Sequence, residues 1–504
     1  MVDSQALAQD RSVVVIGAGT MGAGIAEVAA IAGHRVYLCD TNNAALDRGR
    51  TQIRASLGKR VAKGKASAED AAVAFARVVA AGPGAPLEGV GLVIEAIVEN
   101  LDVKVAALTE MAKRVDTDAI LSTNTSSLSV TALAARLPAP ERVAGLHFFN
   151  PATILPLVEV VRGHATDPAI VDTLVATARA WKKTPVVCQS TPGFIVNRVA
   201  RPFYGEALRL LLEQQTTPET VDAVMRECGG FRMGPCELMD LIGHDVNFAV
   251  TLSVWQAFFH DPRYQPSLVQ QQLVDAGWLG RKSGRGFYDY RDDAPRADVR
   301  NLEGPAPTQM RVEGDLGPAQ GLVPLLEEAG IAVERTEGAD LLRVDGLALA
   351  LTDGRSAAVR SRALGEPVVL FDLALDYAAS KRVALSAAEG TPADVVAKAA
   401  GVFVSLGKQV SLLGDAAGLA VSRTVAMLVN EAADVVQQGI ASEADVDAAM
   451  TGGVNYPVGP LAWGRRIGLD YIAGVLTHLS QAYGEDRYRV SPWLQARALE
   501  VSHG

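Results

Sequence analysis

Hydrophobic and polar positions at the start of the chain follow the order of a strand, a helix and a second strand. An apolar run at 12–16 leads into the glycine-rich segment Gly17–Gly22, and an alanine-rich stretch continues to about Gly33. A second apolar run, 35–39, ends at Asp40. Apolar runs of strand length separated by a helical segment predict a βαβ unit with parallel strands.

Further apolar runs predict that this sheet continues. Four runs of strand length lie at 91–96, 119–122, 142–149 and 157–161. Such unbroken runs are typical of strands that are buried on both faces. The pattern of 41–80 is mostly helical, with many basic residues in 48–65, and from 193 to about Trp278 the pattern is helical again.

The second half of the chain resembles a shortened copy of the first. A constant shift of 225 in residue number pairs Gly193 with Gly418 and Gly234-Pro235 with Gly459-Pro460. Near the start of the copy the shift is 297, and the difference between the two shifts is the length that the copy lacks. Two copies indicate a duplication and not a solenoid, which needs three or more short repeats.

These patterns predict an α/β chain with a Rossmann-like domain and a helical domain, each present twice. The segment 291–308 is charged and rich in proline, as linkers often are. The expected divisions are a Rossmann domain at 11–190, a helical domain at 191–290, a linker at 291–308, a shortened Rossmann-like domain at 309–413, a second helical domain at 414–484 and a tail at 485–504.

Composition narrows the range of partners. The net charge is −10, which argues against a nucleic-acid or anionic-membrane surface as the main binding surface. No apolar run reaches the roughly 20 residues of a membrane span, and the start lacks a signal-peptide pattern. The four cysteines have no zinc-type spacing and do not form a disulfide framework, so we expect a reducing, cytoplasmic location.

The glycine-rich turn carries the features of a dinucleotide site. Gly17 permits the tight turn, Gly19 lets the backbone approach a pyrophosphate, and Gly22 lets the helix pack on the sheet. Asp40 lies eighteen residues past Gly22, where a carboxylate binds ribose hydroxyls and repels the extra phosphate of NADP. The predicted cofactor is therefore NAD. The alternative is a glycine-rich turn without a ligand.

A histidine and a glutamate stand in otherwise apolar strand segments. His147 belongs to an apolar run that ends in Phe148-Phe149-Asn150-Pro151, and Glu159 follows twelve residues later. A buried carboxylate is costly without a partner, and a His–Glu pair supplies one. The imidazole can then take a proton from a substrate hydroxyl. Either residue alone is more often structural, and only the nearby dinucleotide motif favours catalysis.

Two polar segments follow strands and suit a substrate oxygen. Asn197 stands just inside the first helix after the sheet, and Ser126 and Ser127 lie in a polar loop. Loops at the carboxyl ends of parallel strands line the ligand crevice of such sheets. A helix-capping amide and a serine-rich turn are equally reasonable interpretations without outside help.

At this point the chain resembles the 3-hydroxyacyl-CoA dehydrogenase family over about 11–290. The matching motifs, in order, are GAGTMGAGIA, EAIVENLDVK, STNTSSLSV, GLHFFNP, LVEVV and TPGFIVNR. The resemblance implies that His147 is the catalytic base, that Glu159 orients it, and that Asn197 and Ser126 hydrogen-bond the substrate oxygen. The positions that it assigns to the NAD site are Asp40, Glu99, Lys104 and Asn150, and those that it assigns to coenzyme A are Ser56 and Lys63.

The full length is similar to the long bacterial dehydrogenases of phenylacetate degradation, which oxidise 3-hydroxyadipyl-CoA. The motifs KSGRGFYDY and YGEDRYR fit that group, whereas 152–156 departs from the common family pattern. The acyl chain therefore stays open, with 3-hydroxybutyryl-CoA or another short 3-hydroxyacyl-CoA as the alternative. Four arginines are available for a distal carboxylate: Arg201, Arg209, Arg226 and Arg232.

Two further alternatives remain, one of them from another class of protein. One is a binding or structural protein on a dehydrogenase fold, although such a protein would be expected to lose the His147–Glu159 pair. The other is a hydroxyacid dehydrogenase of the phosphogluconate type, which uses a catalytic lysine where this chain has His147.

The second copy is predicted to be catalytically inactive. The shift of 225 places Asp372, Ala384 and Ser422 at the positions of His147, Glu159 and Asn197. The shift of 297 places Leu316 and Ala319 at the positions of the second and third glycines. Its apolar helices remain, so we expect the two helical copies to pair within one chain as an internal pseudo-dimer. A homo-oligomer is also possible.

Overall fold

The computed structural model describes residues 5–292, 294 and 298–501; parts of the expected linker (293, 295–297) and tail (502–504) lie outside the described residues. The chain divides into two compact units. Unit 1 comprises the chain up to Arg198 together with Gln438–Val454, and unit 2 comprises Val199–Gln437 and the chain from Asn455 onward. A segment that the sequence placed inside the second helical domain therefore belongs to the first unit.

Unit 1 is built on an eight-stranded sheet with the order β3-β2-β1-β4-β5-β6-β7-β8. Its strands are β1 (Ser12–Ile16), β2 (Val36–Cys39), β3 (Val78–Ala81), β4 (Val90–Glu95), β5 (Ile120–Thr123), β6 (Val143–Phe148), β7 (Leu157–Arg162) and β8 (Thr184–Gln189). The expected Rossmann fold is confirmed, because the strand order starts from β1 in both directions and so reverses between β1 and β4. Two strands depart from the expected parallel arrangement, because β7 runs antiparallel to β6 and β8 runs parallel to β7.

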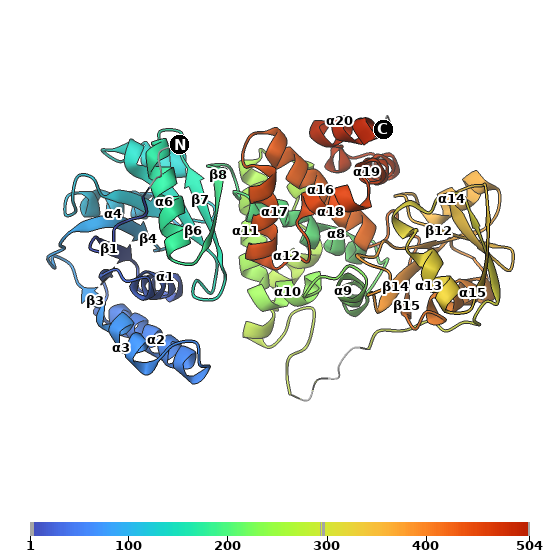
Figure 1. Cartoon of the computed structure of the whole chain (residues 1–504), viewed down its shortest axis with the longest axis horizontal. Helices are drawn as coiled ribbons and strands as arrows, with labels where there is room; N and C mark the ends of the chain where they lie inside the picture. Colours follow the sequence, from blue (N-terminus) through green and yellow to red (C-terminus); the bar gives the residue numbers. More distant parts are fainter. Residues whose placement is uncertain (1–4, 293, 295–297, 502–504) are drawn as a thin grey trace. The chain divides into compact units, whose positions relative to one another are not determined.

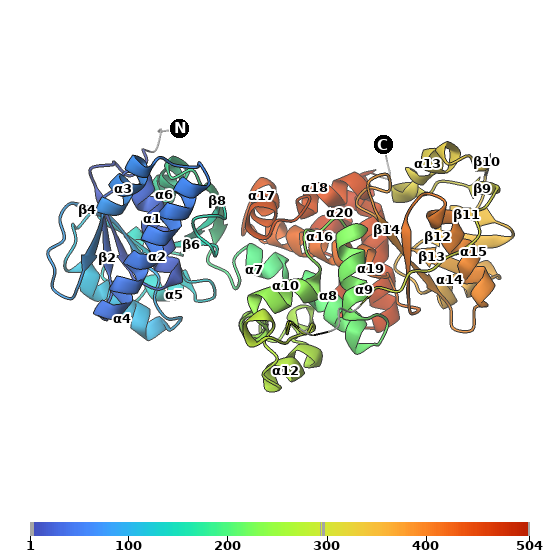
Figure 2. The ribbon, with the colours of Figure 1, turned by 90° about the horizontal axis from the view of Figure 1, so that it is seen from below.

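Helices cover both faces of this sheet. One apolar cluster joins the sheet to α1 (Thr20–Ile31), α2 (Asn43–Ala62), α3 (Ala68–Ala76) and α6 (Pro168–Ala180). A second cluster joins it to α4 (Leu101–Ala112) and α5 (Val130–Ala134). Figure 1 shows this sheet in blue to green with α1 and α6 on it, and Figure 2 shows the same elements from below.

The second half of the chain contributes one helix to unit 1. This helix, α17 (Glu443–Val454), packs against β7 and β8. A Cβ on Gly453 would lie 2.6 Å from Cδ2 of Leu157 and 3.2 Å from Cγ2 of Val196. The helix backbone can therefore approach the first residue of β7 this closely only because position 453 has no side chain.

Unit 2 contains most of both helical copies. The first copy continues from α7 (Val196–Val199) into α8 (Arg201–Leu212), α9 (Pro218–Glu227), α10 (Pro235–Ile242), α11 (His244–Ala257) and α12 (Leu268–Asp275). The second has α16 (Val421–Gln437), α18 (Pro460–Ile467), α19 (Leu469–Tyr483) and α20 (Pro492–Val501). Within the unit, α8 packs against α16.

A buried ion cluster joins these two helices. Glu206 of α8 is inaccessible to solvent, and its carboxylate accepts hydrogen bonds from Nε of Arg423 (2.9 Å) and Nε of Arg487 (3.1 Å). Arg487 belongs to the segment expected to be a tail, and that expectation is wrong. The segment forms a short 3₁₀ helix, Asp486–Tyr488, and then α20, because Arg487 and Tyr488 are buried against Glu206.

The shortened Rossmann-like region of unit 2 is a mixed seven-stranded sheet with the order β10-β9-β11-β12-β13-β14-β15. Its strands are β9 (Gln309–Glu313), β10 (Ala332–Thr336), β11 (Leu341–Val344), β12 (Leu347–Leu351), β13 (Val368–Phe371), β14 (Arg382–Ala387) and β15 (Gln409–Leu413). In Figures 1 and 2 it is yellow to orange, with α13 (Leu322–Glu328), α14 (Ala357–Leu364) and α15 (Ala393–Val404) around it.

The copy keeps the antiparallel strand pairing found at His147 in the first sheet, but it has an aspartate, Asp372, at the histidine position. Asp372 follows β13, and its N–H donates to the carbonyl of Ala384 on the antiparallel strand β14. The Asp372 carboxylate accepts hydrogen bonds from the N–H groups of Ala420, Val421 and Ser422 at the start of α16. It therefore caps a helix where the first copy carries a histidine.

Among the described helices, none is both long and apolar enough to cross a bilayer.

Candidate active site

The glycine-rich turn after β1 leaves backbone amides open to a ligand. Gly17 has φ +105°, and a Cβ there would lie 2.5 Å from the carbonyl oxygen of Ala96. A Cβ on Gly22 would lie 1.8 Å from the carbonyl oxygen of Gly17, so both positions require glycine. Gly19 is the N-cap of α1, no side chain caps the helix there, and the space above Gly19 is open. A helix N-terminus of this kind binds phosphate groups.

Asp40 closes the turn from the end of β2. Its Oδ2 accepts a hydrogen bond from the N–H of Ala18, and its Oδ1 accepts one from the N–H of Asn42, both at 2.9 Å. The half-buried carboxylate is thereby fixed beside the open amides. The turn, the uncapped helix and the adjacent acid together fit the pyrophosphate and ribose of NAD.

The antiparallel pairing of β6 and β7 places His147 directly opposite Glu159. Nδ1 of His147 lies 2.7 Å from Oε2 of Glu159; the histidine is 6% exposed and the glutamate is fully buried. The other carboxylate oxygen, Oε1, accepts hydrogen bonds from the N–H groups of Ile195 (3.1 Å) and Val196 (3.0 Å). The carboxylate holds a proton on Nδ1, so Nε2 has its lone pair available to accept a proton.

The side chain of Asn197 lies over the polar loop that follows β5. Its Nδ2 donates to the carbonyl oxygen of Ser126 over a long 3.5 Å. Both residues are half-buried. The structure thus brings these two predicted residues together, with the amide held loosely enough to turn toward another acceptor.

Glu99 and Lys104 hold that loop in place. Oε1 of Glu99 accepts hydrogen bonds from the N–H groups of Ser126 (3.1 Å) and Ser127 (3.2 Å), and Lys104 lies 3.2 Å from its other oxygen. Burial opposes ionisation of Glu99, but hydrogen bonds from Thr125 and the charge of Lys104 outweigh it and lower its pKa.

Two polar residues of the site region escaped the sequence reasoning. Glu95, at the end of β4, is fully buried and pairs with Lys104 at 2.7 Å. Oδ1 of Asn124 accepts a hydrogen bond from the N–H of Phe148 at 2.8 Å and so ties the serine-rich loop to the histidine strand. Glu95 lies in the motif EAIVENLDVK and Asn124 in STNTSSLSV. These motifs indicated the region but not the individual roles of the two residues.

The remaining predicted residues stand apart from the His147–Glu159 pair. Asn150 is exposed and precedes a cis proline. Ser56, on α2, donates a hydrogen bond to Oε1 of Glu27 at 2.9 Å, and burial raises the pKa of Glu27. Lys63 is the exposed C-cap of α2. No described hydrogen bond of Ser56 leads to the catalytic pair.

Comparison with known families accounts for most of the chain. Residues 12–191 match the family described as 3-hydroxyacyl-CoA dehydrogenase, NAD binding domain. Residues 193–290 and 418–503 both match the C-terminal domain of that enzyme, and 349–416 match the reduced Rossmann-fold domain of 3-hydroxybutyryl-CoA dehydrogenase. The chain belongs to the 3-hydroxyacyl-CoA dehydrogenase family. The predicted second helical copy is thereby confirmed.

Individual relatives agree with this assignment. A 3-hydroxyadipyl-CoA dehydrogenase of Escherichia coli (strain K12) is 46% identical over 97% of this chain and 98% of its own length. A crystal structure of a 3-hydroxybutyryl-CoA dehydrogenase from Escherichia coli K12 has a TM-score of 0.90 and 45% identity, and covers 98% of this chain and 100% of that one. A probable 3-hydroxybutyryl-CoA dehydrogenase of Deinococcus radiodurans is 40% identical over 55% of this chain and 99% of its own length.

The family settles the class of reaction. The chain is an NAD-dependent oxidoreductase that acts on 3-hydroxyacyl-CoA. The expectations of enzyme activity, of NAD as cofactor and of an acyl-CoA substrate are confirmed at this level.

Proposed function

We propose that this chain oxidises (S)-3-hydroxyadipyl-CoA to 3-oxoadipyl-CoA, with His147 as the base. The observation that carries the mechanism is the 2.7 Å contact between His147 and Glu159. The choice of substrate is supported by the full-length relative named 3-hydroxyadipyl-CoA dehydrogenase. Relatives named for 3-hydroxybutyryl-CoA support the alternative of a shorter acyl chain.

The buried pair defines the path of the proton. Nε2 of His147 takes the proton of the 3-hydroxyl group as C3 becomes a carbonyl carbon. The carboxylate of Glu159 stabilises the imidazolium that forms, and the N–H groups of Ile195 and Val196 keep that carboxylate in place. Bound NAD supplies the hydride acceptor.

We assign the remaining predicted residues to binding. Asn197 and Ser126 hydrogen-bond the substrate oxygen, and Asp40 and Asn150 contribute to the NAD site. Glu99 and Lys104 position the loop that carries Ser126. Ser56 and Lys63 lie on or at the end of α2, where they bind the nucleotide end of coenzyme A.

The test is a steady-state comparison of 3-hydroxyadipyl-CoA with 3-hydroxybutyryl-CoA. A higher kcat/KM for the adipyl substrate supports the proposal, whereas a preference for the butyryl substrate supports the alternative. If purified chain with bound NAD oxidised neither substrate, a non-catalytic role would be favoured.

We also propose that the second half is an inactive copy whose helices pair with those of the first half as an internal pseudo-dimer. Support comes from the packing of α8 on α16 and from the buried Glu206–Arg423 pair. At the expected cofactor turn of the copy, Leu316 is 5% exposed, so its side chain fills the place of a glycine. One NAD should bind per chain in equilibrium titration, and two would refute an inactive copy.

A chain truncated after Tyr290 should aggregate or self-associate, because it loses the helices that cover α8. A monodisperse monomer in sedimentation would contradict the pseudo-dimer. We further propose a cytoplasmic location, which is supported by four free, buried cysteines; fractionation of the source cells tests it.

A further inference from the structure

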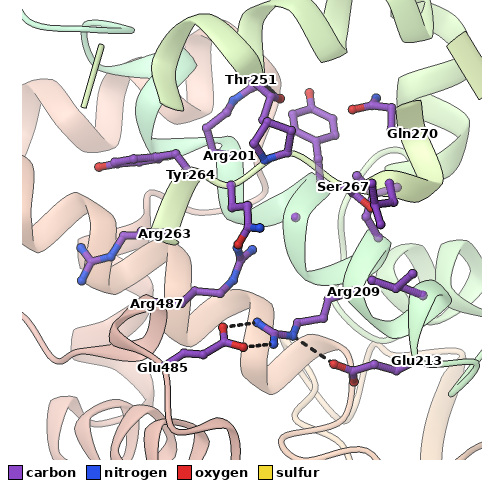
Figure 3. A pocket seen from close by; sticks show the side chains of 17 residues that line it. Arg201, Arg209, Glu213, Thr251, Arg263, Tyr264, Ser267, Gln270, Glu485 and Arg487 are labelled. Carbon is purple, nitrogen blue, oxygen red and sulfur yellow. Dashed lines mark hydrogen bonds and ion pairs between the residues drawn. The ribbon is translucent and has the colours of Figure 1, made fainter. Parts of the chain in front are cut away.

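A pocket of about 290 Å³ lies within unit 2, along one face of α8. Its other walls come from α11, from the segment 263–268 before and at the start of α12, from Gln270, and from Glu485 and Arg487 near the chain end. Figure 3 shows Arg201 beside Thr251 at one end of the pocket, and Arg209 with Glu213 and Glu485 at the other. All of these residues belong to the same compact unit.

The charge of Arg201 is compensated by no acid in the described part of the chain, although its guanidinium lies 4.9 Å from the ring centroid of Tyr204. The residue is only 7% exposed, and Nη1 donates to Oγ1 of Thr251 at 2.9 Å, while Nε has no hydrogen-bond partner. Among the described residues no carboxylate lies within ion-pair distance of Arg201. Burial lowers its pKa, and only the nearby rings of Tyr204 and Tyr456 oppose that effect. Burying an unpaired cation is costly, so a structural role alone accounts poorly for it.

The position of Arg201 on its helix adds to this cost. Arg201 is the first residue of the twelve-residue helix α8, and its N-cap, Ala200, provides no side-chain cap. The N-terminus of a helix carries partial positive charge, so a cation there is repelled and an anion is attracted. Both features favour a bound anion at this end of the pocket.

The other arginines of the pocket already have acids. Arg209 pairs with Glu213 at 3.0 Å and with Glu485 at 2.6 Å. Arg263 pairs with Glu431 and Asp434, and Arg487 pairs with Glu206. Among the arginines that line the pocket, Arg201 is therefore the one whose charge remains available to a bound anion.

Part of the pocket lining is apolar. Leu208 is buried, whereas Leu212 and Leu268 are 51% and 63% exposed and Pro266 completes the wall. Small-molecule sites measure roughly 300–1,000 Å³, so this pocket is at the small end of that range and cannot hold a whole acyl-CoA. An anion with a short hydrocarbon chain matches both the size and the lining.

We propose that this pocket binds the carboxylate of a short aliphatic acid, with Arg201 holding the carboxylate, Thr251 positioning the guanidinium and the leucines contacting the methylene chain. A guanidinium binds a carboxylate through two parallel N–H bonds, and Arg201 has an N–H without an acceptor. The carboxylate has two possible sources, a free acid or the distal carboxylate of a dicarboxylic acyl chain. The binding site itself does not depend on the proposed function.

The test uses the full-length protein and calorimetric titration with hexanoate and with hexan-1-ol, which lacks the charge. Hexanoate should bind one per chain, and Arg201→Met should weaken its binding at least tenfold, about 1.4 kcal/mol. Arg362→Met, which removes an exposed arginine of α14, is the matched control and should bind like the parent. Equal binding of hexanoate and hexan-1-ol, unchanged binding by Arg201→Met, or no binding below about 10 mM would overturn the proposal.

Thermal unfolding separates binding from a structural role. Arg201→Met should keep or raise the Tm of the ligand-free protein, because it removes an unpaired buried charge. If this variant fails to fold, a structural role is indicated, and Thr251→Val then decides by its effect on hexanoate binding. Unchanged binding in that variant also overturns the proposal.

A kinetic comparison identifies the source of the carboxylate and rests on the proposed function. If the source is the substrate, Arg201→Met should lower kcat/KM for 3-hydroxyadipyl-CoA and spare 3-hydroxyhexanoyl-CoA. If both substrates respond alike while hexanoate binding is lost, the occupant is a free acid. An enzyme that does not oxidise the adipyl substrate refutes the proposed function and leaves the hexanoate result standing.

Discussion

Replacing Glu159 by glutamine tests the role of the buried pair with almost no change in volume. Oε1 of the glutamine can still accept the N–H groups of Ile195 and Val196, which keeps the oxygen on that side. The amide NH₂ then faces Nδ1 of His147, which must become an acceptor. The imidazole proton therefore moves to Nε2, and the atom that should take the hydroxyl proton already carries one.

The expected loss is the whole contribution of a general base. Such a base contributes about 10²–10⁴-fold, and a similar tautomer change in the serine-protease triad costs about 10⁴-fold. We expect kcat for Glu159→Gln to fall by about 10³-fold, which is roughly 4 kcal/mol in the activation free energy. The fold should persist because the backbone N–H groups keep an acceptor.

The assay is the rate of NADH formation at saturating substrate, with NAD affinity measured separately. Glu110→Gln is the matched control, because Glu110 lies on α4 with a side chain that is 70% exposed. NAD affinity should stay near that of the parent in both variants. A Glu159→Gln enzyme with kcat within about threefold of the control would refute the reasoning, since the carboxylate would then contribute little to the tautomer or to the imidazolium.

Other parts of the structure lead to four further expected outcomes. The parent should prefer NAD over NADP by at least about tenfold in kcat/KM, and Asp40→Ala should reduce this preference. A parent that uses both cofactors equally would contradict the role of Asp40. Lys63→Ala should raise KM for acyl-CoA but not for a pantetheine thioester without the nucleotide, and equal effects would exclude a phosphate contact. Gly453→Val should lower the free energy of unfolding by about 1–3 kcal/mol and also lower kcat, because its Cβ would lie 2.6 Å from Cδ2 of Leu157. The control is Gly452→Val, whose Cβ would lie 3.7 Å from Cβ of Leu157. Equal losses of unfolding free energy in the two variants would exclude the close contact. Burial and the charge of Arg60 lower the pKa of Lys183 from 10.5 to about 8, so the folded protein binds fewer protons than the unfolded chain between these values and its stability should rise with pH across that window. Denaturant titration at several pH values should show that the free energy of unfolding rises more steeply with pH in the parent than in Lys183→Met. The same dependence on pH in both proteins would contradict the prediction.

The sequence predicted the parts of the site that depend on local motifs. The glycine turn, Asp40, His147 and Glu159 each belong to a short segment, and the dinucleotide motif favoured a catalytic interpretation of the His147–Glu159 pair. The distance between His147 and Glu159 was not predictable in the same way, because it depends on the antiparallel pairing of two strands in a sheet expected to be parallel.

Other features depend on contacts between distant segments. The constant shift between the two copies placed Asp372 at the histidine position, but only the structure shows that its carboxylate caps α16, as Glu159 caps α7 in the first copy. The expected tail was wrong because Arg487 and Tyr488 find their partner, Glu206, far away in the first helical copy. Arg201 was one of four arginines that the sequence offered for a distal carboxylate, and its lack of an acid became visible only once the side chains around it were placed.

The helix α17 belongs to unit 1 but is synthesised long after the rest of that unit. A ribosome that has produced β1 to β8 has made every residue of the sheet, yet the helix that packs on β7 and β8 begins only at Glu443, after the whole of the second sheet. Domains generally fold in the order in which they emerge, and exposed apolar strands promote aggregation. Here the apolar surface around Leu157 stays uncovered, and must not aggregate, until nearly the whole chain has been synthesised. The partial chain should therefore depend on chaperones that bind apolar surfaces for most of its synthesis, and the finished chain should not.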